Sequence, residues 1–328
     1  MSHHLSSGII PAPVLPFEEN GAIDWNMLDR YIVQVAAGNP RGIAMNMALS
    51  EVSSLEIAEQ VEVIRRVKAA IKGSCTLLSG VNVTHTAAAI EHAKRLVDAG
   101  AEGLVIFPPV PAFLSAPTVQ MIVDYHAAVA DAVDVPMLAF QTNFCNYPRG
   151  SITALSEIKN IVAIKDASFN VDLTLDNVKE ARAAKRRIGS LTGSDTFILE
   201  AMLMGCDGAL IGFAATATNA LVRMHTYTTE GKITEAYHIW NRLGPLARIC
   251  WRHPIRDYRV RTKYSLVKQG VLKNFVVRAP FPTILDADRK DIDEAFVDFD
   301  LNDQQFLPAG AMSTEKPRSS TKVLAAAK

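Results

Sequence analysis

Short apolar segments alternate with longer amphipathic segments along most of the chain. The apolar runs are rich in Val, Ile, Leu and Ala and are bounded by Gly, Pro or Asn, a pattern typical of buried strands. We expect strands over residues 8–15, 42–46, 75–81, 103–107, 136–142, 161–167, 188–193 and 208–213. Between them, apolar positions recur with helical spacing, which predicts helices over residues 26–37, 57–71, 84–99, 118–132, 172–184 and 219–230.

This strand–helix repetition predicts an α/β fold, an eight-stranded (β/α)8 TIM barrel. Several helices end on a glycine shortly before the next strand, namely Gly38, Gly73, Gly100 and Gly205. A doubly wound sheet is the alternative, but no GxGxxG motif follows the first strand, where residues 16–21 instead indicate a turn. We therefore favour the barrel.

The pattern changes after the eighth strand. Residues 233–246, 255–268 and 289–296 have helical spacing, and no further strand is expected. The last residues are rich in Ser, Thr, Lys, Pro and Ala, which is typical of a disordered tail. We expect a catalytic barrel over 8–230, a C-terminal helical extension over 231–300, and a disordered tail over 301–328.

Composition excludes some classes of protein. The chain has 34 basic and 34 acidic residues, so its net charge is zero, and neither a nucleic-acid surface nor a polybasic membrane patch is expected. The four cysteines are far apart and form no CxxC pair, and the histidines show no HxH or HExxH spacing. No apolar run approaches the ~18 residues of a membrane span. We expect a cytoplasmic protein with no metal.

Lys165 stands out because it lies in the apolar segment 161–167. Strand alternation places it on one face with the small residues Ala163 and Ala167, which leaves room for a ligand. Burial lowers the pKa of a lysine, and a neutral amine attacks ketones to form a Schiff base. A structural lysine paired with a carboxylate is the alternative. In a barrel, however, Lys165 would lie at the C-terminal strand ends, where active sites are found.

Short motifs follow one another in order over residues 8–297. They are PVLPFEENGAID at 13–24, EVSSL at 51–55, IKDAS at 164–168, GSD at 193–195, GCDGAL at 205–210, KYSLVKQG at 263–270 and RAP at 278–280. By these motifs the chain resembles the dihydrodipicolinate synthase / N-acetylneuraminate lyase family, Schiff-base lyases of pyruvate and other 2-oxo acids. The resemblance implies that Lys165 is the Schiff-base lysine, that the Leu210 backbone lines the floor of the site, and that the protein is a dimer or tetramer.

The chain departs from this family at the groups that move protons. Ala48 and Leu49, followed by Ser50, replace the two threonines of the family's motif after the second strand, and Phe140 replaces its fifth-strand tyrosine. A further family tyrosine is missing near Val110. Imine chemistry needs an acid or base near the reacting atoms. Substitutes by proximity or chemistry are Ser50, Glu51, Thr142, Asn143, Cys145, Tyr147 and His253, of which Tyr147 is the first choice. The substrate could instead supply the group, or turnover could be poor.

Other residues are predicted to bind substrate. Ala48, Leu49 and Phe140 make the pocket more apolar, which favours a substrate with an aromatic or alkyl part over a polyhydroxylated sugar acid. Arg149 could clamp a carboxylate, or could be a solvated turn residue. The segment after Gly193 could present N–H groups to an anion, or Ser194 or Asp195 could cap the next helix.

The sequence therefore predicts a lyase that needs no cofactor and forms a Schiff base between Lys165 and a pyruvate-like 2-oxo acid. Aldol cleavage, condensation and dehydration all remain open. We expect it to be a poor 4-hydroxy-tetrahydrodipicolinate synthase, because the proton relay is missing. The alternative is a catalytically weakened carbonyl- or amino-acid-binding protein on the same barrel.

Overall fold

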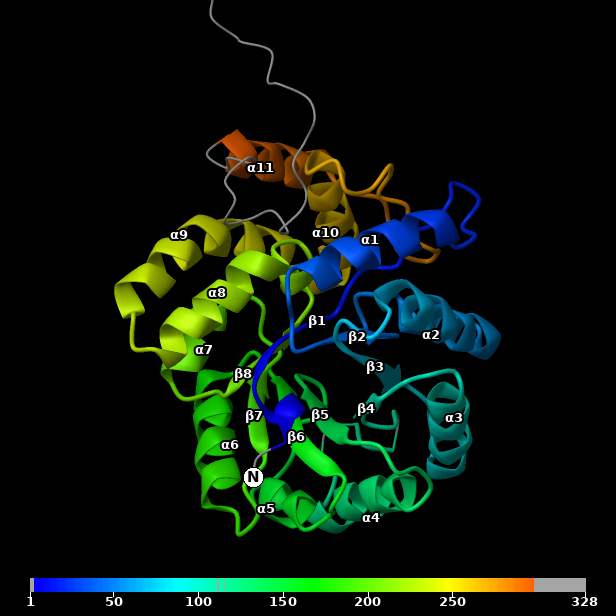
Figure 1. Ribbon diagram of the computed structural model, residues 1–328, viewed down its shortest axis with the longest axis vertical. Coiled ribbons are helices and arrows are strands. Elements are labelled where there is room, and N and C mark those ends of the chain that lie inside the picture. The colour runs from blue at the N-terminus through cyan, green and yellow to red at the C-terminus, as the bar shows by residue number, and fades with distance from the viewer. Residues whose placement is uncertain (1–2, 111, 115, 298–328) are drawn as a thin grey trace, which may run out of the picture.

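The structure, a computed structural model, describes residues 3–110, 112–114 and 116–297, and these form a barrel of strands surrounded by helices (Figure 1). The strands are β1 (Gly8–Pro11), β2 (Gly42–Met45), β3 (Thr76–Val81), β4 (Gly103–Ile106), β5 (Met137–Thr142), β6 (Ile161–Ala167), β7 (Gly189–Thr192) and β8 (Gly208–Ile211). They pair in parallel in the order β1-β8-β7-β6-β5-β4-β3-β2. The predicted TIM barrel is confirmed.

The two ends of the sheet meet and nearly close the barrel. The Arg41 N–H, just before β2, donates a hydrogen bond of 2.8 Å to the Ile9 carbonyl in β1. At the N-terminal ends of the strands, the short 3-10 helix η1 (His4–Ser6) packs Leu5 into the interior of the barrel. This plug leaves the C-terminal strand ends as the side where a site can open.

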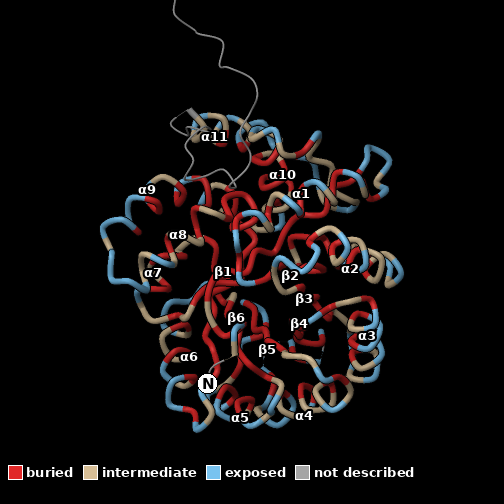
Figure 2. Tube along the Cα trace, in the orientation of Figure 1, coloured by how far each residue is buried: buried red, intermediate tan, exposed pale blue. Residues whose placement is uncertain are grey.

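Side chains of successive strand residues alternate between two apolar layers. One layer fills the barrel and includes Ile10, Ala44, Leu78, Val105 and Leu138. The other layer packs against the helices and includes Ile9, Ile43, Leu77 and Leu104. In β6, Ala163 belongs to the inner layer and Ile164 to the outer one, so Lys165 projects into the barrel as its alternation predicts. The strands are buried on both faces (Figure 2).

Several strands end earlier than their apolar runs predict. β1 stops at Pro11 rather than continuing to residue 15, because Pro11 and Pro13 have no N–H to donate to a neighbouring strand. β2 stops at Met45, since Asn46 adopts a left-handed conformation with φ of 54°. In both cases the chain leaves the sheet at the C-terminal side of the barrel, where the following residues become available to a site.

The helices of the barrel lie outside the strands. They are α1 (Trp25–Ala37), α2 (Ile57–Ile71), α3 (Thr86–Asp98), α4 (Val119–Ala130), α5 (Ser151–Ser156), α6 (Val171–Ala183), α7 (Ile198–Leu203) and α8 (Thr218–Thr229). Polar side chains begin several of them. Asp24 accepts a hydrogen bond from the Met27 N–H at 2.9 Å, and Asn170 accepts one from the Leu173 N–H at 3.1 Å. These bonds satisfy backbone donors that a helix leaves free at its start.

The C-terminal helices gather beside the barrel (Figure 1). They are α9 (Ile233–Cys250), a 3-10 turn η4 (Ile255–Asp257), α10 (Tyr258–Lys268) and α11 (Asp286–Val297). The buried guanidinium of Arg261 holds α10 to α11, because its Nε donates to Asp288 at 2.8 Å and its Nη1 to the Arg252 carbonyl at 2.7 Å. This links the helical region into one body that can present side chains to the barrel.

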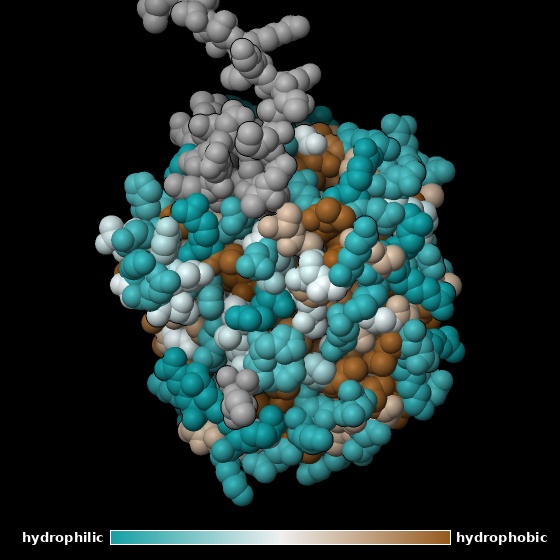
Figure 3. Space-filling model, viewed as in Figure 1, coloured by the Kyte–Doolittle hydropathy of each residue, from teal (hydrophilic) through white to brown (hydrophobic). Residues whose placement is uncertain are grey.

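No helix among the described residues is long and apolar enough to cross a membrane. The face in Figure 3 is largely hydrophilic, with scattered hydrophobic patches. The tail predicted over 301–328 lies outside the residues that the structure describes.

Candidate active site

A cavity of about 390 Å³ opens at the C-terminal ends of the barrel strands. This is within the range of sites for small molecules. From the barrel it is lined by Met47, Leu49, Phe140, Lys165, Ala167 and Asp195, among others. The C-terminal helical region completes the lining with Trp251, Ile255, Arg256, Tyr258 and Arg259. The apolar residues outnumber the polar ones, so most of the surface offered to a bound molecule is apolar.

Lys165 is the buried amine of this cavity. Its side chain is 7% exposed, and its Nζ lies 4.1 Å from the centre of the Phe140 ring. Burial lowers the pKa of Lys165 to about 8, although the nearby charge of Asp195 acts in the opposite direction. At neutral pH roughly one tenth of this side chain is therefore the neutral amine, the nucleophilic form, which is far more than for a lysine in water.

The space around Lys165 depends on a missing side chain in the next strand. β6 pairs with β7, and Gly193 follows β7 directly. A Cβ atom at Gly193 would lie 2.8 Å from the Lys165 Cε and 2.9 Å from the Ala167 Cβ. Only a glycine fits there without moving the lysine, so the Lys165 side chain packs directly against Gly193.

Phe140 and its neighbours make one side of the cavity apolar. Phe140 packs edge-on against Phe107, with ring centres 4.8 Å apart, and both rings belong to the inner apolar layer of the barrel. On another side, Leu49 fits closely against Gly212, where a Cβ would lie 2.6 Å from the Leu49 Cδ2. Aromatic and alkyl groups of a ligand would find favourable contacts on both sides.

Asp195 is buried in the same cavity, with 4% of its surface exposed. Its Oδ1 accepts a hydrogen bond of 2.7 Å from the Phe213 N–H, just after β8. Burial raises the pKa of Asp195 to about 7, against the opposing influence of this bond and of Lys165. The predicted helix-capping role is wrong for this residue, because α7 begins after Phe197 and no side chain caps it.

The contribution of the C-terminal helical region is missed by sequence reasoning. Tyr258 stacks on Trp251 with ring centres 5.5 Å apart, and both line the cavity. Arg259 donates from its Nε to the Ala48 carbonyl at 2.8 Å and lies over the rings of Tyr258 and Phe281. No local motif signals these contacts, since they join residues far apart in the sequence.

Most of the chain is similar to one family of known proteins. Residues 5–297 match the Dihydrodipicolinate synthetase family. The chain belongs to this family of lyases. It is 28% identical over 296 residues to a 4-hydroxy-tetrahydrodipicolinate synthase of Chlorobium phaeovibrioides, covering 89% of this chain and 97% of that protein. Identity to the enzyme of the same name from Oceanobacillus iheyensis is 23% over 295 residues, with coverage of 89% and 97%.

Solved structures of family members share the fold. The dihydrodipicolinate synthase of Oceanobacillus iheyensis superposes with a TM-score of 0.81 at 21% identity, over 90% of this chain and 97% of that one. The synthase of Acinetobacter baumannii, a chloride-inhibited enzyme crystallised with pyruvate, gives a TM-score of 0.79 at 24% identity, over 89% and 98%. These likenesses establish the barrel with its C-terminal helices.

Several residues predicted from the family resemblance lie together in the structure. Ala48, Leu49, Phe140, Lys165 and Gly193 all line the cavity. Thr142 and Asn143 line it as well, and the buried Thr142 Oγ1 has no hydrogen-bond partner in the described part of the chain. The structure therefore joins residues from four separate strand ends around the lysine.

The remaining predicted residues lie elsewhere. The Tyr147 hydroxyl donates to the Phe140 carbonyl at 3.0 Å, and its ring packs near His126 in the outer layer. Arg149 is largely exposed and pairs with Asp176 at 3.0 Å. Leu210 is buried within the barrel. None of the three is among the residues that line the cavity.

Ser50 and Glu51 support the loop that carries Ala48 and Leu49. The Ser50 hydroxyl donates to the Pro13 carbonyl at 2.8 Å and accepts from the Met47 N–H. The buried Glu51 forms an ion pair of 2.6 Å with Lys263 of α10. These bonds fix the loop after β2 rather than facing the cavity. His253 is exposed, and Cys145 pairs through its backbone with Thr142.

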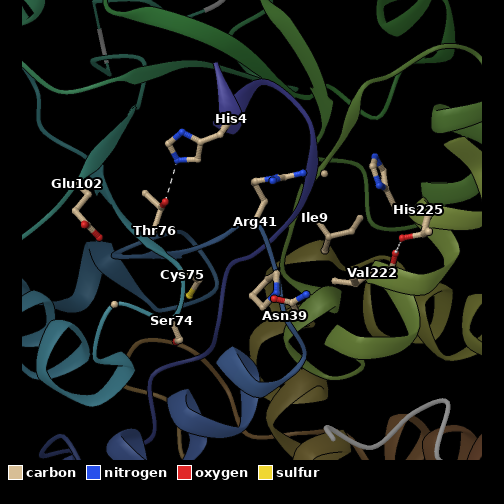
Figure 4. Close-up of a pocket in the computed structure, with 14 residues that line it drawn as sticks. His4, Ile9, Asn39, Arg41, Ser74, Cys75, Thr76, Glu102, Val222 and His225 are labelled. Carbon is tan, nitrogen blue, oxygen red and sulfur yellow. Dashed lines mark hydrogen bonds between the residues drawn. The ribbon is translucent and has the colours of Figure 1, made fainter. Parts of the chain in front are cut away.

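A second hollow, of about 480 Å³, lies among the N-terminal strand ends (Figure 4). It is polar, and Arg41, His4 and His225 approach it from three segments. Its one thiol, Cys75, has a pKa raised by burial and is therefore protonated. Without a buried nucleophile, this hollow lacks the chemistry of the cavity around Lys165. No group of His, Cys, Asp and Glu among the described residues could hold a metal ion.

Proposed function

We propose that the protein is a lyase that forms a Schiff base between Lys165 and a pyruvate-like 2-oxo acid and then catalyses aldol cleavage, condensation or dehydration. The observation that carries this proposal is the burial of the Lys165 amine at the C-terminal strand ends, inside a cavity of the size of a small molecule. Family membership supports the reaction class, because the matched family consists of lyases of this kind.

The chemistry begins with the neutral amine. Lys165 Nζ attacks the carbonyl carbon of the 2-oxo acid, water is lost, and the resulting iminium withdraws electrons from the adjacent carbon. A bond to that carbon can then break or form with the electron pair held by the iminium. Burial lowers the Lys165 pKa and so provides the neutral amine at physiological pH.

The substrate we propose carries an aromatic or alkyl group next to its 2-oxo acid. Leu49 and Phe140 line the cavity with apolar surface, and Ala48 offers no hydroxyl where the family's synthases have a threonine. A sugar acid would bury hydroxyl groups there without partners, which is costly. We also propose that the protein is a poor 4-hydroxy-tetrahydrodipicolinate synthase, because Ala48, Leu49 and Phe140 supply no hydroxyl groups for the proton relay of the family's synthases.

Reductive trapping tests the Schiff base. Incubation of the protein with pyruvate or phenylpyruvate and borohydride, followed by peptide mass spectrometry, should place one reduced adduct on Lys165. Lys165→Ala should abolish the adduct, whereas Lys159→Ala, at a lysine outside the cavity, should leave it unchanged. Absence of an adduct on Lys165 with every 2-oxo acid tried would rule out the proposal.

The second candidate is a binding protein that forms the imine but turns over poorly. Phe140 favours it, since a phenyl ring beside Lys165 cannot move a proton. Single-turnover trapping compared with steady-state product formation separates the two. An adduct that accumulates without cleavage, condensation or dehydration products from any aromatic or alkyl 2-oxo acid would favour the binding protein.

We also propose a homo-oligomer, a dimer or tetramer, on the basis of the family resemblance. Among the solved relatives, one dihydrodipicolinate synthase variant is described as monomeric. Light scattering of the purified chain after gel filtration would give its mass, and a mass of one chain over a wide range of concentration would contradict this proposal.

A further inference from the structure

The cavity around Lys165 contains a second group that can carry a proton. Among the described residues that line it, Asp195 is the one carboxylic acid. Its position follows from the strand order, because β7 lies next to β6. Asp195 comes two residues after Gly193, against which Lys165 packs. Lys165 and Asp195 are thus brought to neighbouring strand ends by the sheet itself.

The Asp195 carboxyl is fixed by a backbone hydrogen bond and forms no ion pair with Lys165. The Phe213 N–H binds Oδ1 at 2.7 Å and fixes the carboxyl between the ends of β7 and β8. Lys165 and Asp195 influence each other's charge, yet they form no ion pair within 4.0 Å in the described part of the chain. The carbonyl of a substrate bound to Lys165 could therefore lie between the two groups.

The surroundings of Lys165 and Asp195 bring the pKa values of both groups close to neutral pH. Burial raises the pKa of Asp195 to about 7 and lowers that of Lys165 to about 8. Two further titratable groups feel the Asp195 charge, the Cys250 thiol of α9 and the Tyr258 phenol of α10, each with a pKa raised to about 12 by burial. The guanidinium groups of Arg256 and Arg259 also line the cavity. The thiol and the phenol stay protonated near neutral pH and arginines stay charged, so Lys165 and Asp195 are the groups that titrate in this range among the described residues that line the cavity.

We propose that Asp195 is the catalytic acid–base residue that moves protons for Lys165, at a site where Phe140 supplies no hydroxyl. This inference rests on the proposed Schiff-base function. It assigns the proton transfers to the loop after β7, rather than to the fifth-strand position from which the family's tyrosine acts.

The protons balance when the pair begins with a neutral amine and a protonated carboxyl. The amine attacks the carbonyl carbon, and Asp195 gives its proton to the carbonyl oxygen as the C=O π bond breaks. The carbinolamine nitrogen returns one proton to Asp195. Asp195 then protonates the departing hydroxyl, and water leaves with the C–O bonding electrons. The products are the iminium on Lys165, a carboxylate on Asp195 and one water.

The other hydroxyl groups near the cavity fit this role less well. Thr142 has an unpartnered hydroxyl, but an alcohol does not accept a proton near neutral pH. With its pKa raised to about 12, Tyr258 is a weak acid that gives up its proton far less readily near neutral pH than Asp195 does. The Tyr147 hydroxyl already donates its hydrogen bond to the Phe140 carbonyl, and Tyr147 does not line the cavity. Asp195 alone can both give and take a proton here.

Imine formation by Asp195→Asn tests the inference. With pyruvate and borohydride, the trapping rate at pH 7.5 should fall about 10²- to 10⁴-fold, the usual contribution of a general acid–base group. Asp176→Asn, at a carboxylate on the surface, should keep the wild-type rate, and Tyr258→Phe should change it far less than Asp195→Asn. Circular dichroism and thermal unfolding establish that the variants are folded.

The wild-type protein provides a test that needs no variant. Its trapping rate should be bell-shaped in pH, rising as the doubly protonated pair loses one proton near pH 7 and falling as the second is lost near pH 8. A rate that rises to a plateau at high pH, or an Asp195→Asn protein that traps pyruvate at the wild-type rate, would overturn the role of Asp195. Absence of any wild-type adduct would instead defeat the proposed function itself.

Discussion

The Lys165 Nζ lies 4.1 Å from the centre of the Phe140 ring, across the paired ends of β6 and β5. This contact has two opposing effects on the lysine. The ring excludes water, which disfavours the ammonium, while its π face attracts a cation. Burial as a whole lowers the pKa of Lys165.

Two substitutions of Phe140 should separate these effects. Phe140→Leu keeps the site dry but removes the π face, so the Lys165 pKa should fall below its wild-type value. Phe140→Ala admits water, so the Lys165 pKa should rise towards that of a free lysine. The pH dependence of Lys165 modification by an amine-specific reagent would measure both. Shifts in the same direction would contradict this account.

A methyl group at Gly193 should disable the lysine without removing it. The added Cβ would lie 2.8 Å from the Lys165 Cε, so Gly193→Ala should displace the amine and lower the trapping rate with pyruvate at least about 10²-fold. Gly103→Ala, whose nearest contact would be 3.3 Å, is a control elsewhere in the barrel. A wild-type trapping rate in Gly193→Ala would show that Lys165 does not depend on close packing against Gly193.

The size of the cavity should change in opposite directions at Leu49 and Gly212. Leu49→Ala enlarges it and should favour phenylpyruvate over pyruvate, while Gly212→Ala pushes Leu49 and Trp251 inward and should disfavour phenylpyruvate. Each change should alter the ratio of the two trapping rates by about 10-fold or more. Equal ratios in both variants and the wild type would place the substrate's side chain elsewhere.

The ion pair between Glu51 and Lys263 should matter for stability. Both side chains are almost completely buried, with Nζ and Oε1 2.6 Å apart. Lys263→Met removes the ammonium partner of the buried Glu51 carboxylate, which keeps the hydrogen bond of 2.9 Å from the Arg278 N–H, and should lower the free energy of unfolding by about 3–5 kcal/mol. Chemical denaturation measures the change, and Lys268→Met, at an exposed pair with Asp293, should cost less than about 1 kcal/mol.

The same substitution should disturb the cavity. Glu51 follows the residues 48–50 directly, so the loss of Lys263 frees the segment that carries Ala48 and Leu49. We expect weaker binding of phenylpyruvate by folded Lys263→Met, measured by the concentration dependence of trapping. A stability loss below about 1 kcal/mol would mean that Glu51 finds another partner.

Much of the barrel could be predicted from local patterns. Apolar runs with small residues between amphipathic helices determine that strands and helices alternate, and the two-residue period of a strand determines that Lys165 faces the interior with Ala163 and Ala167. The strand ends were predicted less well. Pro11 and Asn46 end β1 and β2 early, because one lacks a donor and the other takes a left-handed conformation.

Some features of the site follow from local sequence, and others come from contacts between residues far apart in the chain. The sequence by itself determined that Lys165 lies in a buried strand, which face of the strand it occupies, and that Ala48, Leu49 and Phe140 carry no hydroxyl group, because each of these depends on a residue type and its place in the chain. Only the tertiary structure decided that Asp195 lies in the same cavity as Lys165 rather than capping a helix, and that Tyr258 and Arg259 complete the lining of that cavity. Those contacts arise from strand order and from the docking of α10, which bring together residues that share no local pattern.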